Sequence, residues 1–515
     1  MQRNKDGEQK FFKLFGHFSL ALILSATSLN AESFADFKKS QAESFAQYKD
    51  ERDNEFNKYL KQQWKAYSVL KGKDRYEEPK PKVIPPTKQT KIKSVGPKVS
   101  IKVKKIKPTP VQKKSVAPKK QPIVQKTLTP KVAKVTKPTT IVVTKPMIMP
   151  IVVPDKDINF NFYGTKLGFN IPLKIKNANF HPQNQKGITG FFESAASSDY
   201  ENLIDEIEDV KNDMNLNDWA TYLLVLKVSD QVYKNQDNAK LLSWFIFNKL
   251  GYAVKVGLAQ KNVVLMHYSK KTIYSTPNYS FGKRKFYVLS HYSKGSVGRL
   301  FSYKQDYPGS TKALDLSLST LPYLVSDTQS KTLSFKEYGT TYKIPFEYNK
   351  NLIDFMATYP QADYETYFNA PVDGRTYKSI AEALKRYVDG MQAGDAMNFV
   401  LHFVQKSFDY SKDNAQFKRE KVMFAQETLY FDKSDCEDRA VLFSYLVKEL
   451  FGIGVVGVHY KGHMATALYV PMKGDYIEAG SRKFVVADPT YINSNIGQSM
   501  PKYKSSKPEN FIVVK

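Results

Sequence analysis

Apolar residues follow four different patterns along this chain. A largely apolar run covers residues 14–24, and aromatic residues recur every 11 positions between about 32 and 70. Residues 71–155 show no such period, because lysine, proline, valine and threonine dominate there. From about residue 156 onward, apolar helical stretches combine with short β-branched runs, and this mixture predicts a globular region.

The first apolar run has the features of an export signal. Lys10 and Lys13 precede it, and small and polar residues follow it as far as Ala31. The run is too short for a comfortable transmembrane helix. We therefore predict that residues 1–31 form a signal peptide cleaved after Ala31, and that the protein is exported to the periplasm or cell envelope. An uncleaved N-terminal anchor is the alternative.

The aromatic repeat predicts an amphipathic helix over residues 32–70. Phe34, Phe45 and Phe56 stand 11 residues apart, and each is followed three residues later by another aromatic ring. These spacings place the rings on one face of a helix, with charged residues at its flanks. That face could dock onto the protein's own body, mediate self-association or contact a membrane surface. We favour docking or self-association, because acidic residues interleave with the lysines.

Residues 71–155 are predicted to be a disordered linker. Between Pro79 and Pro154 there are 19 lysines and no aspartate or glutamate. Prolines and like charges keep such a segment extended, and it cannot bury a core. The linker could make weak, salt-sensitive contacts with anionic polymers of the cell envelope.

Most of the net charge of the chain lies in this linker. The net charge is +28, and setting aside the 19 linker lysines leaves about +9 for the rest of the protein. A mildly basic remainder does not predict a specific nucleic-acid partner. The chain has one cysteine, Cys436, so it cannot form an intramolecular disulfide in the oxidising compartment that export predicts.

The globular region contains an internal repeat. Three pairs of segments match in the same order, namely 162–175 with 337–349, 235–251 with 436–452, and 282–290 with 480–488. Each copy combines a β-rich entry, helices, one apolar core helix and closing strands. We therefore predict two tandem α+β domains, 156–328 and 329–515.

The single cysteine lies at the start of the core helix of the second copy. Ser434 or Asp435 can cap this helix, with Asp438 bonding back as in a capping box. Cys436 then lies in the first turn, where backbone N–H groups and the helix dipole stabilise a thiolate. The neighbouring acidic residues oppose this effect, so a catalytic cysteine here needs a histidine partner.

Two histidines follow the cysteine, and one of them has the position of a partner. His463 begins the predicted strand "HMATALYV", and His459 ends the strand before it. Downstream, the apolar run "KFVVAD" ends in Asp488, whose carboxylate could orient an imidazole and hold its tautomer. Paired with His463, the Cys436 thiol should have a pKa well below the reference value of about 8.5.

The segments "DCEDRAVLF", "GHMATALYV" and "VADPTY" resemble the three motif blocks of the transglutaminase-like branch of the papain-like cysteine enzymes, in the same order. The resemblance implies an α+β fold in which the nucleophile helix packs on an antiparallel sheet. It also implies acyl transfer through a thioester, with Cys436 as nucleophile, His463 as general base and acid, and Asp488 as orienting group. Gln426 and Tyr430 are candidates for the second oxyanion donor.

Each of these residues also has a structural interpretation. Cys436 could be a small buried hydrophobic residue, and His463 could be a structural histidine. His459 could be the base in place of His463, and Asp488 could cap a turn before Pro489.

The first copy lacks the three chemical residues. Asn235 stands at the position of Cys436, Ser290 at that of Asp488, and Val263 at that of His463 if one residue is inserted. The scaffold pattern persists without them. We therefore expect the first copy to be a degenerate, noncatalytic module for substrate binding or packing.

The predicted function is an exported, transglutaminase-like cysteine hydrolase, a peptidase or amidase acting on peptide or isopeptide bonds. A noncatalytic scaffold of the cell envelope and a cross-linking transglutaminase are the alternatives. The expected partner is a peptide or protein substrate, and the oligomeric state is open. We expect no cofactor and no metal, because no group of residues has the sequence spacing of a zinc or calcium site.

Overall fold

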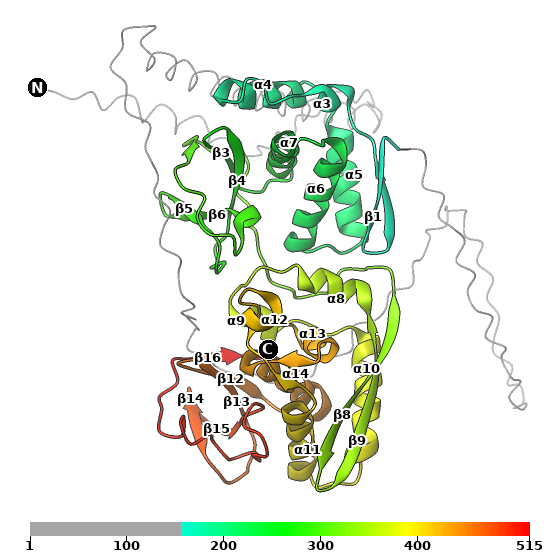
Figure 1. Cartoon of the computed structure of the whole chain (residues 1–515), viewed down its shortest axis with the longest axis vertical. Coiled ribbons are helices and arrows are strands. Elements are labelled where there is room, and N and C mark those ends of the chain that lie inside the picture. The colour runs from blue at the N-terminus through cyan, green and yellow to red at the C-terminus, as the bar shows by residue number, and fades with distance from the viewer. Residues whose placement is uncertain (1–155) are drawn as a thin grey trace, which may run out of the picture. The chain divides into compact units, whose positions relative to one another are not determined.

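The computed structural model describes residues 156–515 (Figure 1). The predicted signal peptide, amphipathic helix and lysine-rich linker lie outside the described residues. Within 156–515 the chain combines helices with mainly antiparallel sheets, which confirms the predicted α+β class. None of the helices in this range has the length and apolar character that a membrane crossing needs.

The first copy runs from a hairpin through a group of helices into a sheet. Its elements are β1 (Ile158–Phe162), β2 (Thr165–Phe169), α3 (Leu173–Asn177), α4 (Gln185–Ala196), α5 (Glu201–Asp213), α6 (Asp218–Val232), α7 (Gln236–Lys249), β3 (Val254–Ala259), β4 (Asn262–Tyr268), β5 (Asn278–Phe281), β6 (Arg284–Tyr287), the short 3₁₀ helix η1 (Leu289–His291) and β7 (Phe301–Ser302). Helix α7 is buried along most of its length, because its "LLSWFIF" run is apolar on every side.

The second copy repeats this order with additional elements. They are β8 (Thr328–Glu337), β9 (Thr340–Asn349), α8 (Lys350–Ala357), α9 (Tyr364–Phe368), α10 (Gly374–Val388), α11 (Ala393–Lys406), β10 (Asp409–Tyr410), α12 (Asp413–Phe417), α13 (Ala425–Tyr430), β11 (Lys433–Ser434), α14 (Cys436–Phe451), β12 (Val455–Tyr460), β13 (His463–Leu468), β14 (Tyr476–Ala479), β15 (Arg482–Ala487) and β16 (Asn510–Val513). Helix α14 packs against β12, β13 and α11.

The two five-stranded sheets have the same strand order. One runs β5-β6-β4-β3-β7 and the other β14-β15-β13-β12-β16, and in both the core helix immediately precedes the central hairpin. The entry hairpins also share a turn. Tyr163–Gly164 and Tyr338–Gly339 all have positive φ, the backbone that a two-residue hairpin turn requires. The sequence repeat thus corresponds to a repeat of topology.

The central hairpins correct one expected correspondence between the copies. In the first copy Ala259 pairs with Asn262 across a two-residue turn, and in the second Tyr460 pairs with His463 in the same way. Asn262, rather than Val263, therefore occupies the position of His463. Asn262 and His463 are separated by the same number of residues as Asn235 and Cys436. The match between the copies therefore needs no inserted residue.

The second copy carries an insertion directly before its core helix. In the first copy only three residues separate α6 from α7, whereas β10, α12, α13 and β11 lie between α11 and α14. Strand β10 pairs with β11 in parallel, which brings the start of the insertion next to Ser434. The insertion thereby places polar residues beside the N-terminal end of α14 that the first copy cannot provide.

Candidate active site

Cys436 is the first residue of α14. Asp435 is the N-cap of this helix. Its backbone N–H donates a hydrogen bond to Asp438 Oδ2 at 3.2 Å. This is the predicted capping box, with Asp435 rather than Ser434 as the cap. The Oδ1 of Asp438 accepts the Met423 N–H at 2.8 Å, which ties the start of the helix to the insertion. The position of the sulfur is therefore set by a well-anchored helix end.

His463 and Asp488 form a buried pair. His463 Nε2 lies 2.8 Å from Asp488 Oδ2, and the two residues are only 6% and 2% exposed. Asp488 Oδ1 accepts the backbone N–H groups of Thr490 and Tyr491, and the Tyr503 ring stacks on the imidazole with centroids 4.7 Å apart. The carboxylate and the imidazole are thus held rigidly, and Nδ1 is the nitrogen left for chemistry.

Cys436 lies at the same end of β13 as His463. The backbone N–H of Met464, the residue next to His463, is near enough to the sulfur to lower the thiol pKa. The thiol itself donates to Glu437 Oε2 at 2.9 Å. No hydrogen bond among the described residues joins Cys436 to His463, so His463 and Asp488 are the only joined members of the predicted triad. The catalytic roles of the three residues stay a prediction.

The surroundings of Cys436 correct our expectation for its acidity. Burial raises the pKa of the thiol well above its ordinary value, and the charges of Glu437 and Asp435 raise it further. The N–H of Met464 lowers the pKa, but this effect is smaller. The expected thiol pKa below 8.5 is therefore wrong for this arrangement, because burial first, and the acidic neighbours second, outweigh the helix N-terminus. At neutral pH the resting site holds a thiol rather than a thiolate.

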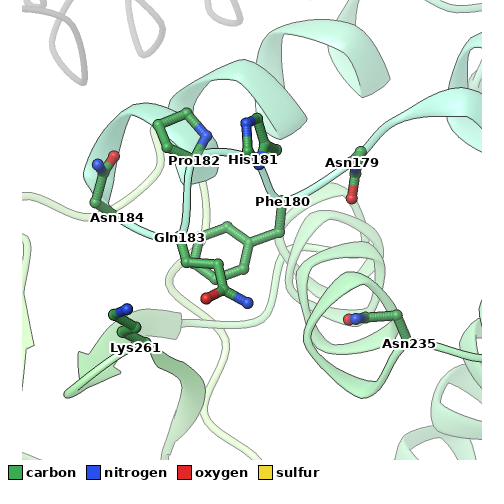
Figure 2. Close-up of a pocket in the computed structure, with 8 residues that line it drawn as sticks. All are labelled: Asn179, Phe180, His181, Pro182, Gln183, Asn184, Asn235 and Lys261. Atoms are coloured by element: carbon green, nitrogen blue, oxygen red, sulfur yellow. The ribbon is translucent and has the colours of Figure 1, made fainter.

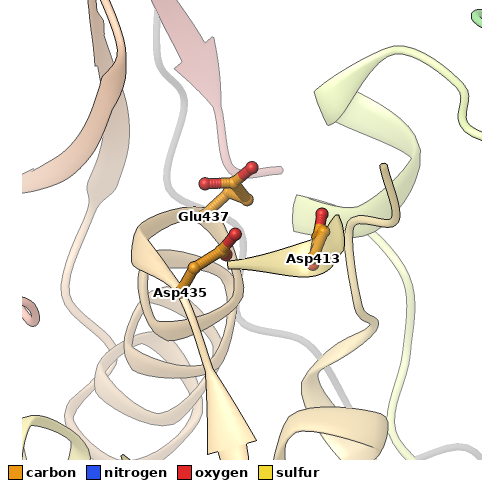
Figure 3. A group of neighbouring side chains, drawn as sticks. All are labelled: Asp413, Asp435 and Glu437. Atoms are coloured by element: carbon orange, nitrogen blue, oxygen red, sulfur yellow. The ribbon is translucent and has the colours of Figure 1, made fainter. Parts of the chain in front are cut away.

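Three carboxylates meet beside the thiol (Figure 3). Asp413, Asp435 and Glu437 each offer an oxygen, and these oxygens lie within 4.8 Å of one another. The spacing suits a divalent cation, although acidic groups commonly gather without one. Our sequence analysis missed this group, because Asp413 lies on the insertion and comes near Asp435 only through the tertiary structure. Burial, followed by the charges of neighbouring carboxylates, raises the pKa of Asp435 to about 12.

These buried carboxyl groups make the stability of the second copy depend on pH. Burial first, and neighbouring carboxylates second, raise the pKa of Asp413 to about 8 and that of Asp438 to about 7. In the unfolded chain both groups lose their protons near pH 4. The unfolded state therefore binds fewer protons between about pH 4 and 8, so the free energy of unfolding falls as the pH rises through this range.

We accordingly expect the thermal midpoint of the full chain to fall by several degrees between pH 5 and pH 8, measured by calorimetry with EDTA present. Each kcal/mol shifts the midpoint of a domain of this size by about 2–4 °C. Asp413→Asn should flatten this fall. Asp475→Asn is the control, because a backbone hydrogen bond from Ser499 lowers the pKa of Asp475. A midpoint that rises with pH, or an unchanged slope in Asp413→Asn, contradicts this account.

Gln405 on α11 connects both halves of the site, and our sequence analysis did not find it. Its side-chain Nε2 donates to the Asp488 carbonyl at 2.9 Å, and its Oε1 accepts the Asn493 N–H. Its own carbonyl accepts Arg439 Nη1 at 3.1 Å. Gln405 is completely buried, so it holds the loop after β15 in register with α14. The signal in the sequence is a lone amide within the apolar run "FVLHFVQKSF".

Arg439 connects the first turn of α14 to the segments that precede it in the chain. Its guanidinium donates to Ser434 Oγ and to the carbonyls of Gln405 and Phe408, and the residue is 1% exposed. Burial lowers the pKa of this guanidinium, while the charges of Asp435 and Asp438 act in the opposite direction. A buried cation therefore partly offsets the acidic group around the cysteine.

Two tyrosines, rather than the two predicted oxyanion candidates, share the surroundings of Cys436. Burial first, and the charges around Cys436 second, raise the pKa of both Tyr364 and Tyr410, that of Tyr410 to about 12. Gln426 instead accepts the Asp373 N–H through Oε1, and Tyr430 packs on Tyr348. No described contact brings Gln426 or Tyr430 to the sulfur.

His459 lies on β12, one residue before Tyr460, which pairs with His463 in the sheet. It pairs with Met464 across the strands, and its ring packs near Tyr364, 5.4 Å between centroids. Its Nδ1 has no hydrogen-bond partner among the described residues, and Glu509 Oε2 is 3.7 Å away. Burial lowers the pKa of His459. Because no carboxylate is hydrogen-bonded to it among the described residues, His459 lacks the support that Asp488 provides to His463.

Comparisons with known proteins do not place this chain in a family. No protein family, no curated protein and no solved structure matches it. The functional argument therefore depends on the chain's own residues and their arrangement.

Proposed function

We propose that the second copy is a cysteine hydrolase of the papain-like, transglutaminase-like type, which cleaves peptide or isopeptide bonds in the cell envelope. The observation that carries the proposal is the buried His463–Asp488 hydrogen bond of 2.8 Å beside a cysteine at a helix N-terminus. A carboxylate on Nε2 holds the imidazole with Nδ1 available as a base, and this order of groups is what a cysteine nucleophile requires.

The proposed reaction proceeds from a neutral thiol and a neutral imidazole. The Cys436 side chain first leaves Glu437, and its S–H proton passes to His463 Nδ1 as sulfur bonds to the substrate carbonyl carbon. The C–N bond then breaks, and the leaving amine takes the proton from His463, which produces a thioester. Water attacks the thioester, transfers its proton through His463 to the sulfur, and releases the acid. General-base transfer of this kind tolerates the raised thiol pKa.

Water is the acyl acceptor that we propose, because no described residue indicates a pocket for an amine. Tyr364 and Tyr410 are the hydroxyl groups near Cys436 that could donate to the oxyanion. The reaction itself needs neither a cofactor nor a metal ion in this scheme, and the substrate is a peptide or protein.

A second candidate function is a noncatalytic scaffold in which Cys436 is structural. The observation that favours it is the thiol's hydrogen bond to Glu437, together with the burial and charges that raise the thiol pKa. A structural cysteine needs no reactive sulfur, whereas a nucleophile must leave Glu437 during turnover.

Cleavage of a quenched fluorescent peptide library separates the two functions. The full chain should cleave a subset of peptides, and Cys436→Ala should reduce the rate to background while keeping its thermal midpoint. Adding a primary amine and analysing the products by mass spectrometry distinguishes hydrolysis from transamidation. Cleavage that survives in Cys436→Ala, or a thiol that iodoacetamide labels only in denaturant, is incompatible with the proposed enzyme.

A further inference from the structure

The first copy has a pocket at the position where the second copy has its thiol. The cavity has a volume of about 480 Å³ and is lined by residues 179–184 together with Asn235 and Lys261. Figure 2 shows the 179–184 segment passing the N-terminal end of α7, where Asn235 lies, with Lys261 on the β3–β4 turn. This volume lies within the range of small-ligand sites. The function proposed above does not use this pocket.

The pocket wall is fixed to the core helix. Asn238 on α7 is 8% exposed, and its Oδ1 accepts the Phe180 N–H at 2.8 Å. Its Nδ2 donates to Asn179 Oδ1 at 3.2 Å. One buried amide therefore holds the lining segment against α7, so the pocket is preformed.

The amides that line the pocket present hydrogen-bond donors. Asn184 Oδ1 accepts the Lys186 N–H at 2.9 Å, and Asn235 Oδ1 accepts two N–H groups of α7. Asn179 Oδ1 is used by Asn238. A helix cap must present its oxygen to the backbone N–H groups, so the NH₂ groups of Asn184 and Asn235 remain for a ligand. The N–H groups that Asn235 caps are already satisfied, so side chains rather than the helix end would contact the ligand.

The charge on the pocket lining is positive. Lys261 is exposed and lines the pocket, and no aspartate or glutamate does. The nearby Asp237 is already paired, because its Oδ1 accepts the Val263 N–H and forms an ion pair with Lys240 at 3.0 Å. A lining of amide donors and one ammonium group is complementary to an anion that is rich in acceptor oxygens.

We infer that this pocket binds a carboxylate-bearing peptide segment, with Lys261 and the amide NH₂ groups of Asn179, Asn184 and Asn235 as its donors. Two rings line the pocket: Phe180, which is 6% exposed, and the exposed imidazole of His181. The choice of a peptide carboxylate over a nucleotide therefore rests on the peptide hydrolase proposed above, and the oligonucleotide probe in the test below decides between the two. The first copy would then be a recognition module, with an amide at the start of the core helix, where the second copy carries its thiol.

Fluorescence anisotropy tests this with the full chain carrying Cys436→Ala, so that no probe is cleaved. The probes are a labelled triglutamate peptide and its triglutamine amide analogue, at 0.15 M salt. We expect the acidic peptide to bind at least tenfold more tightly. Asn235→Asp should weaken this binding at least tenfold at unchanged stability, because aspartate caps a helix as well as asparagine but replaces the donor by a negative charge.

Lys261→Glu should weaken binding to the same extent. Lys283→Glu is its matched control, because Lys283 is an exposed lysine on the β5–β6 turn, at the other end of the sheet, and does not line the pocket. Equal binding of the two peptides, equal effects of the two lysine changes, or tighter binding of a labelled oligonucleotide would each overturn the inference. Because the probe protein lacks the thiol, the outcome does not depend on the proposed hydrolase.

Discussion

Replacing His463 with alanine should reduce peptide cleavage by about 10²–10⁴-fold, because the Cys436 proton then has no base to accept it. The loss should appear in kcat rather than KM, since His463 acts on the reacting proton. The domain should stay folded, because the first copy builds the same hairpin with Asn262 at this position. Steady-state kinetics and a thermal melt of each variant check both statements.

The control for this prediction is His459→Ala, which removes the neighbouring histidine, to which no carboxylate is hydrogen-bonded among the described residues. Cleavage should change little in this variant. Asp488→Asn should have an intermediate effect, because an amide can keep the hydrogen bond but favours the wrong tautomer of the imidazole. If His459→Ala abolishes cleavage and His463→Ala does not, the base has been misassigned.

Replacing Glu437 with glutamine should make Cys436 markedly more reactive. The thiol donates to Glu437 at 2.9 Å, and the carboxylate is the largest contribution to the raised thiol pKa after burial. Glutamine keeps the size of the side chain and removes the charge. Each unit by which the thiol pKa falls raises the thiolate fraction tenfold, and the lower nucleophilicity of the weaker base reduces the net gain to about threefold to fourfold in rate.

The rate of iodoacetamide labelling between pH 6 and 10, with EDTA present, measures this effect. The curve for Glu437→Gln should be shifted to lower pH. Glu449→Gln is the matched control, because it makes the same change near the C-terminal end of α14, away from the sulfur. Coincident curves for the wild type and Glu437→Gln would show that burial alone sets the thiol pKa.

The strand patterns predicted a strand-borne His463 and a strand-end Asp488, and both lie at one end of the second sheet. Their catalytic roles, and that of Cys436, stay a prediction. The prediction was possible because a capped helix start, a strand start and a strand end are local features, and adjacent antiparallel strands bring such ends together. The match between Val263 and His463 was wrong by one residue, because apolar similarity cannot resolve the register that the two-residue turn sets. The side chains of Gln405 and Asp413 were missed, because their partners are distant in sequence.

Periodicity and turn residues in the sequence were sufficient for the α+β class, the internal repeat and the capped start of the cysteine helix, because these depend on contacts between near neighbours along the chain. The chemical state of the site depended on the tertiary structure. Burial of the thiol, the charges of Glu437 and Asp435, and the hydrogen bond to Glu437 reverse the expected direction of the thiol pKa. The donor-lined pocket of the first copy likewise arises where residues 179–184 meet Asn235 and Lys261. Desolvation and charge–charge energies depend on distances in space, and only folding determines those distances.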